Sequence, residues 1–133
     1  MIQRLTMMEP ILRASPRFVP VWEEFVEEWK SESAELPLYL VLADLARHIA
    51  SLYQEGAEAE LRDILSVVEA WHLEGDGYVR EAATIGLLED LQNTNVVAPV
   101  DPSNFVRFLG PESKRWWAKV ERFWENGELI RDD

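Results

Sequence analysis

The sequence of 133 residues contains no cysteine and only two histidines. Without cysteine, the chain can form no disulfide scaffold, no thiolate zinc site and no cysteine nucleophile. Two histidines are too few for a His-rich metal site. A Ser/His/Asp order, a Gly-rich phosphate loop and the HExxH and GxSxG motifs are also missing. We therefore expect a protein that is not an enzyme and that holds no cofactor and no metal.

Basic residues are scarce, with 13 Lys and Arg against 25 Asp and Glu, which gives a net charge of -12. Residues 16–100 carry the whole excess, with 17 acids and 5 bases. Such a surface repels nucleic acid and anionic lipid, because both are polyanions. It attracts a basic protein and speeds the encounter. The simpler interpretation is that the charge only keeps the protein in solution.

Long apolar runs are missing as well. The longest one, residues 36–45, is interrupted by Asp44 and is far shorter than the roughly 20 residues that cross a bilayer. Residues 1–14 mix Arg4, Glu9 and Arg13 with apolar residues, unlike a targeting segment. We expect a cytoplasmic protein that binds neither membranes nor nucleic acid.

Apolar residues recur at helical spacing through most of the chain. Phe18, Trp22, Phe25 and Trp29 form one such stripe. Similar stripes and their start and stop residues predict further helices over about 37–56, 57–75, 76–92, 101–110 and 111–127. The prediction is an all-α protein, a compact bundle of six to seven helices or a short HEAT-like stack of antiparallel pairs. It forms one domain over 1–133, in which 1–15 and 128–133 can fray.

Several single residues mark where the predicted helices begin and end. Gly56 suits the left-handed position that ends a helix, and Asp76 suits an N-cap. Asp101 followed by Pro102 is a helix start. Gly86 lies inside a predicted helix, where glycine costs about 0.8–1 kcal/mol relative to alanine. Its position on an apolar face predicts that another helix approaches closely there.

Two pairs, each of one acidic residue and one histidine, are the candidate metal ligands. Glu69 and His72 have the Glu-x-x-His spacing that di-iron bundles use, and Asp44 and His48 can join them if the two helices are neighbours. The alternative is that these are ordinary pairs on helix surfaces. The sequence leaves open whether the four side chains converge.

The last predicted helix combines tryptophans with basic residues. Trp116 and Trp117 lie about 100° apart on a helix, so one of them can face a partner. Glutamates on the same helix favour internal ion pairing of its basic residues over nucleic-acid binding, and docking against the acidic part of the chain is a further option. The basic residues are Lys114, Arg115, Lys119 and Arg122.

Two segments carry a resemblance to a known family. The stretch from Gly77 to Asn93 (GYVREAATIGLLEDLQN) resembles a motif of an uncharacterised family of small acidic all-helical bacterial proteins. The segment from Phe108 to Ser113 (FLGPES), followed by Trp116 and Trp117, is similar to its C-terminal signature. Such proteins resemble immunity proteins encoded beside polymorphic or contact-dependent toxins. The resemblance implies no catalytic residue.

Charge and resemblance together lead to a hypothesis. We expect a non-enzymatic protein-binding module, an immunity protein that neutralises a basic toxin domain. Its binding face is predicted where acids are dense, at Glu23, Glu24, Glu27, Glu28, Glu89 and Asp90. The alternative is a helical scaffold or regulatory protein without a toxin partner, which can form a homodimer.

Overall fold

The computed structural model describes residues 1–32 and 34–132, and the regular secondary structure in that part of the chain is helical. The prediction of an all-α fold is therefore confirmed. The longer helices are α2 (Val19–Trp29), α3 (Leu38–Glu55), α4 (Glu58–Glu74) and α8 (Pro111–Asn126). The shorter elements are α1 (Glu9–Ala14), η1 (Pro16–Phe18), α5 (Gly77–Glu81), η2 (Ala82–Leu88), α6 (Glu89–Gln92), α7 (Thr94–Val97) and η3 (Pro102–Phe108).

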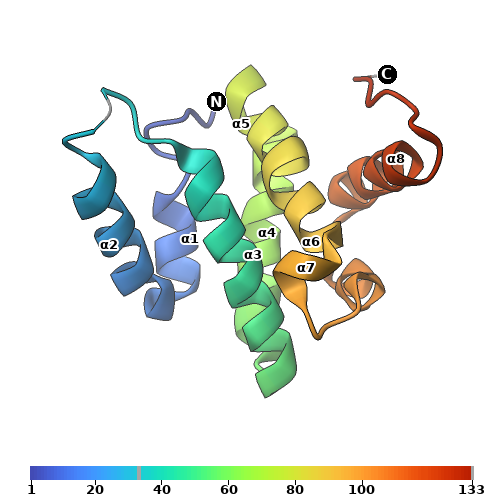
Figure 1. Ribbon diagram of the computed structural model, residues 1–133, viewed down its shortest axis with the longest axis horizontal. Helices are drawn as coiled ribbons and strands as arrows, with labels where there is room; N and C mark the ends of the chain where they lie inside the picture. Colours follow the sequence, from blue (N-terminus) through green and yellow to red (C-terminus); the bar gives the residue numbers. More distant parts are fainter. Residues whose placement is uncertain (33, 133) are drawn as a thin grey trace.

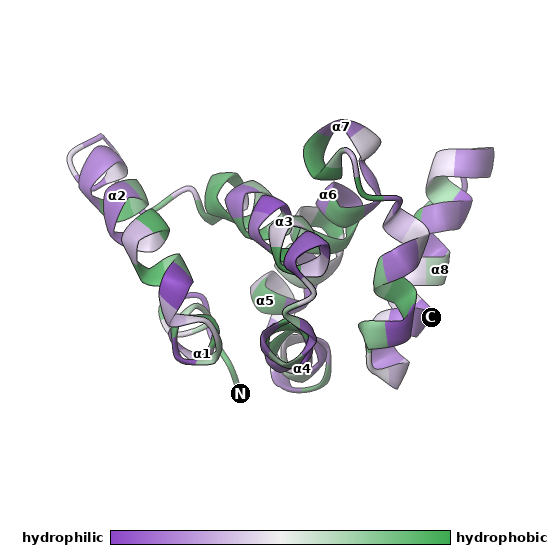
Figure 2. Cartoon of the chain, turned by 90° about the horizontal axis from the view of Figure 1, so that it is seen from below, coloured by the Kyte–Doolittle hydropathy of each residue, from purple (hydrophilic) through white to green (hydrophobic). Residues whose placement is uncertain are grey.

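The helices are arranged in two layers (Figure 2). One layer contains α2, α3, α6 and α7, and the other contains α1 beneath α2 and α4 beneath α3. Helix α3 runs between α2 on one side and α6 on the other, and α8 closes the side farthest from α2 (Figure 1). The short link between α3 and α4 makes them antiparallel neighbours, as the sequence predicts.

The core lies between these layers. Burying one large aliphatic side chain contributes about 1.5–3 kcal/mol, so the long faces of α3 and α4 carry much of the hydrophobic stabilisation. Met7 and Ile11 add fully buried side chains from the N-terminal segment. The side chains on the inward faces of α3 and α4 are buried: Leu38, Val41, Leu42, Leu45, Ile49, Leu52, Leu61, Ile64, Leu65, Val68, Trp71 and His72.

Most predicted helix ends are confirmed. Gly56 and Gly127 have φ of 76° and 66° and end α3 and α8. The Asp76 carboxylate accepts the N–H of Val79 at 2.9 Å and caps α5. Asp101 likewise accepts the N–H of Ser103 at 3.0 Å. The helix that Asp101 begins is, however, a 3₁₀ helix, η3, where the stripe predicted an α-helix.

Residues 77–92 form one continuous helix whose middle, η2, is π-helical. The N–H of Glu89 donates to the carbonyl of Thr84, five residues earlier. The apolar pattern predicts a regular helix here and does not reveal the wider turn. The close approach at Gly86 is confirmed, because a Cβ there would lie 2.7 Å from the Leu42 side chain of α3.

The residues after Gly127 fold back along α8. The Lys119 ammonium donates to the carbonyl of Arg131, and Arg122 pairs with Glu128 at 3.6 Å. None of the described helices has both the length and the hydropathy that a bilayer crossing requires.

Candidate protein-binding site

Helix α2 presents its four predicted binding residues on two different sides. Glu24 and Glu28 line a groove between α2 and α3, whereas Glu23 and Glu27 are exposed outside it. A helix turns about 100° per residue, so residues four apart share a side and the adjacent pair does not. The groove therefore receives two of the four predicted acids of α2.

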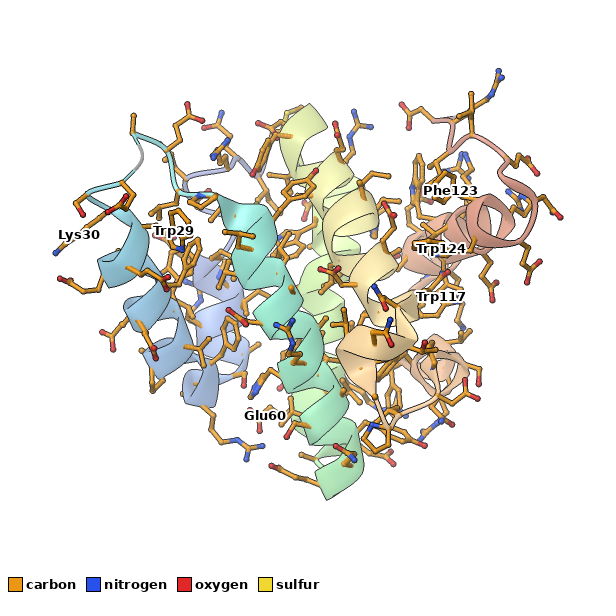
Figure 3. All side chains as sticks on the ribbon, viewed as in Figure 1. Trp29, Lys30, Glu60, Trp117, Phe123 and Trp124 are labelled. Carbon is orange, nitrogen blue, oxygen red and sulfur yellow. The ribbon has the colours of Figure 1, made fainter. Side chains whose placement is uncertain are left out.

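The groove has a volume of about 370 Å³ and an apolar floor. Phe25 is buried at its base, while Val21 and Leu40 are 37 % and 51 % exposed. Trp29 points toward α3, and Lys30 points away on the opposite side of α2 (Figure 3). The lining residues are Val21, Glu24, Phe25, Glu28 and Trp29 on α2, with Leu40 and Asp44 on α3.

The carboxylates of the groove differ in how they are neutralised. Asp44 pairs with Arg47 at 3.0 Å. Within the described part of the chain, Glu24 and Glu28 make no hydrogen bond or ion pair. Two unneutralised charges thus stand beside exposed apolar surface. This combination suits a partner that presents cations next to an apolar ridge.

Glu89 and Asp90 lie on α6, on the other side of α3 from the groove (Figure 1). Burial raises the pKa of Asp90 to about 6, although the nearby Arg47 opposes the shift. Burial also raises the pKa of Glu89, with a contribution from the charge of Asp90. These two half-buried acids are therefore separate from Glu24 and Glu28, and α3 lies between the two groups.

His48 belongs to a polar cluster at the N-terminal end of α4, which we call the Glu60 cluster (His48, Ser15, Glu60 and Arg17). The fully buried Ser15 hydroxyl donates to Glu60 and lies 2.8 Å from Nε2 of His48. A hydroxyl has one proton, so His48 must be the donor in its bond to Ser15. Arg17 pairs with Glu60 at 2.9 Å and with Glu55 at 3.0 Å.

His72 belongs to a second cluster toward the other end of α4, which we call the Glu69 cluster (His72, Glu69, Ser113 and Thr84). Glu69 accepts the N–H groups of Glu112 and Ser113 at 3.0 and 2.8 Å and so caps α8. His72 lies 2.9 Å from the Ser113 hydroxyl through Nδ1 and 3.1 Å from the Thr84 hydroxyl through Nε2. A Cβ at residue 110 would lie 2.4 Å from the Glu69 carboxyl carbon, so any larger residue there would displace the carboxylate that caps α8.

Burial controls the titration of the Glu69 cluster. It lowers the pKa of His72 to about 4, against the opposing charges of Glu69 and Glu112, so the imidazole is neutral at neutral pH. Burial opposes ionisation of Glu69 too, but the bonds from Glu112 and from the N–H and hydroxyl of Ser113 outweigh it and lower its pKa. Because the imidazole is neutral, one of its ring nitrogens donates and the other accepts in the bonds to Ser113 and Thr84.

The four candidate metal ligands do not converge. Asp44 lines the α2–α3 groove, His48 joins the Glu60 cluster, and Glu69 and His72 join the Glu69 cluster. No group of three or more His, Asp or Glu side chains among residues 1–32 and 34–132 is arranged to hold a metal ion. Glu69 and His72 do share a helix face, as their spacing predicts, but they bind the start of α8.

The tryptophans of α8 face different surroundings. Trp117 is buried, and its indole N–H has no partner within the described residues. The Trp116 ring lies nearly parallel to the His72 ring, with centroids 6.4 Å apart. Trp116 also borders a second hollow, of about 470 Å³, which Thr84 and Ile130 help to line. Trp124 is 53 % exposed at the outer side of α8 (Figure 3).

The basic residues of α8 are largely paired within the chain. Arg115 pairs with Glu112 at 2.8 Å and also donates to the carbonyl of Asp132. Lys119 lies over the Trp116 ring, 4.4 Å from its centroid. The predicted internal pairing is thus confirmed for Arg115 and for Arg122.

Sequence reasoning missed the apolar rim of the groove and the hydroxyl partners of the histidines. Val21 and Leu40 stand beside the buried stripes of their helices, which was the available signal. Ser15, Thr84 and Ser113 gave no signal, because their partners lie on other helices.

Comparisons with known proteins match the chain to a family. The family described as a domain of unknown function, DUF7674, matches residues 8–125. No curated protein matches the chain, and no solved structure does.

Proposed function

We propose that the chain, which belongs to the DUF7674 family of domains of unknown function, is a non-enzymatic module that binds a basic protein. The observation that carries the proposal is the α2–α3 groove. It combines exposed apolar side chains with Glu24 and Glu28, which have no partner in the described part of the chain. The net charge of -12 adds long-range attraction for a cationic partner.

The polar groups that resemble catalytic machinery have other roles in the fold. The Ser15 hydroxyl is fully buried and donates to Glu60, so it is not positioned as an activated nucleophile. Both ring nitrogens of His72 are engaged by hydroxyl groups, and the residue is buried. These contacts give Ser15 and His72 structural roles, which supports a non-enzymatic function for the protein.

The biological setting we propose is toxin neutralisation. The sequence resembles immunity proteins of toxin systems, and many toxin domains are nucleases that bind phosphate through Lys and Arg. An acidic protein that covers such cations blocks the path of the nucleic acid. Complementary charge then gives fast capture, and buried apolar anchors give slow release.

The test is capture of a partner followed by a growth assay. The immobilised protein is incubated with lysate of its source cell and washed through a salt series, and the retained proteins are identified. We expect one basic protein, released as salt rises, whose toxicity on expression is relieved by co-expressing this chain. A retained basic protein that is not toxic would overturn neutralisation, and the lack of any basic partner would overturn the proposal as a whole.

A second candidate function is a homodimeric scaffold, which the exposed Trp124 on α8 favours. Sedimentation of the wild-type protein and of Trp124→Ser distinguishes the two. A dimer that dissociates in the variant supports the scaffold, and a monomer in both removes it.

A further inference from the structure

We infer that the α2–α3 groove takes one amphipathic basic helix of the partner, with an apolar ridge in the groove and Lys or Arg along the flank that faces Glu24 and Glu28. This inference rests on the proposed function and specifies its binding surface. The lining residues of α2 are Val21, Glu24, Phe25, Glu28 and Trp29, at positions i, i+3, i+4, i+7 and i+8. They form one continuous side of α2, about 12 Å long at 1.5 Å per residue.

The shape of the site favours a helix as its occupant. The groove is walled by two α-helices, whose backbone groups are already bonded within each helix. An extended peptide would find no sheet edge there to pair with. A helix, by contrast, packs a ridge of side chains spaced three and four residues apart into the groove between two others.

The charges specify the flanks of that helix. Glu24 and Glu28 stand along the α2 wall, and Asp44 stands on the α3 wall beside Leu40. Asp44 is already paired with Arg47 at 3.0 Å, so the unneutralised charge lies along the α2 wall, and the partner's cations are expected on that flank of its ridge. A second copy of α2 is a poor occupant, because it would bring its own Glu24 and Glu28 against the same charges.

Two double variants of α2 separate the groove from the overall charge. Glu24→Lys with Glu28→Lys reverses the acids that line it. Glu23→Lys with Glu27→Lys reverses two acids of the same helix, at the same spacing, that lie outside it. Both variants change the net charge by the same amount. Circular dichroism checks that both keep the helical content of the parent.

The probe is a synthetic helical peptide of about four turns with a leucine ridge flanked by lysines. One control peptide carries glutamate for each lysine, and another carries alanine for each leucine. Binding is measured by calorimetry at low salt, and the contacted residues are mapped by amide chemical shifts. We expect shifts confined to α2 and α3, affinity about 30-fold weaker for the groove variant, and about threefold weaker for its control.

Each other outcome contradicts one part of this inference. Equal weakening of both variants would mean that total charge drives binding, which overturns the groove but leaves a basic partner intact. Equal affinity for the alanine peptide would remove the role of the apolar floor. If the peptide shows no saturable binding up to about 1 mM while the lysate still yields a basic partner, the claim that the groove takes a basic helix would be wrong, and the proposed function would stand. A lysate that yields no basic partner would overturn the proposed function itself, and this inference with it.

Discussion

The Glu60 and Glu69 clusters, near opposite ends of α4, use the same three residue types to different effect. In both, a histidine bonds to the hydroxyl of a serine, and the serine donates to a glutamate, through its hydroxyl in the Glu60 cluster and through its N–H in the Glu69 cluster. The Glu60 cluster is partly exposed and adds Arg17, so its glutamate is held by a cation. The Glu69 cluster is more deeply buried and adds backbone N–H groups and Thr84. Its histidine is neutral and its glutamate caps a helix.

This difference shows that the surroundings, rather than the residue types, set what a His-Ser-Glu cluster contributes. Where water reaches the ion pair, it screens the charges and limits their contribution to stability. Where water is excluded, each hydrogen bond to the carboxylate contributes more, and breaking it leaves buried groups unsatisfied. We expect α8 to depend strongly on Glu69 and the N-terminal segment to depend less on Glu60.

The largest expected effect comes from removing the two glutamates. Glu69→Ala should lower the free energy of unfolding by about 3 kcal/mol, because the N–H groups of Glu112 and Ser113 lose a charged acceptor at the start of α8. Glu60→Ala should cost less than half of that. Urea denaturation measures both, with the exposed Asp63→Ala of the same helix as a control that should change little. Equal losses of unfolding free energy in the two variants would contradict the proposed difference between the Glu60 and Glu69 clusters.

The next effect is the response to acid. Because the folded pKa of His72 is about 4 and the unfolded value is 6.5, the unfolded chain binds protons more readily, and stability falls as pH drops below 6.5. Between about pH 7.5 and pH 5 this loss is about 2 kcal/mol. His72→Gln should remove this pH-dependent loss, whatever its effect at neutral pH.

His48→Gln is the matched control for that experiment. Burial lowers the pKa of His48 as well, but Glu60 opposes the shift. The pH dependence should therefore change less than in His72→Gln. Unfolding curves at several pH values measure both slopes, and a larger change in the His48 variant would reverse our ranking of the two clusters.

The smallest expected effect has the opposite sign. Asp90 has a folded pKa of about 6 against an ordinary 3.8, so its charge destabilises the fold above pH 6 and the cost disappears as the pH falls. Asp90→Asn should stabilise the protein at about pH 7.5 by less than about 1 kcal/mol, since the half-exposed group is screened. Below about pH 4 the two proteins should match. Thermal unfolding at both pH values tests this, and an advantage that persists in acid would contradict it.

Local features of the fold were predictable from the sequence. The Asp76 cap and the left-handed glycine at 56 each depend on one residue and its immediate backbone. Gly86 signalled a close contact, but not that Leu42 of α3 would make it. The inward faces of α3 and α4 follow from the spacing of apolar residues along single helices.

Features that depend on which helices meet were not predictable. Ser15 reaches Glu60 across 45 residues, and His72 reaches Ser113 across 41, and no local pattern shows such pairs. The same applies to the groove, since the spacing of Glu24 and Glu28 does not reveal Leu40 opposite them. The π-helical turn was missed because apolar residues occur on almost every side of residues 82–88.

The π-helical segment also has a consequence for insertions and deletions. A turn with bonds five residues apart accommodates one more residue than a regular turn does. Deleting one residue within Ala82–Leu88 would therefore restore a regular helix and leave Glu89 to Gln92 in nearly the same orientation relative to α5. Leu91 would stay buried, and the change would be confined to the wide turn, where Thr84 meets His72. The wide turn thus matters more for the hydrogen bonds of His72 than for the path of the chain, and a one-residue deletion there would leave both flanking helices in place.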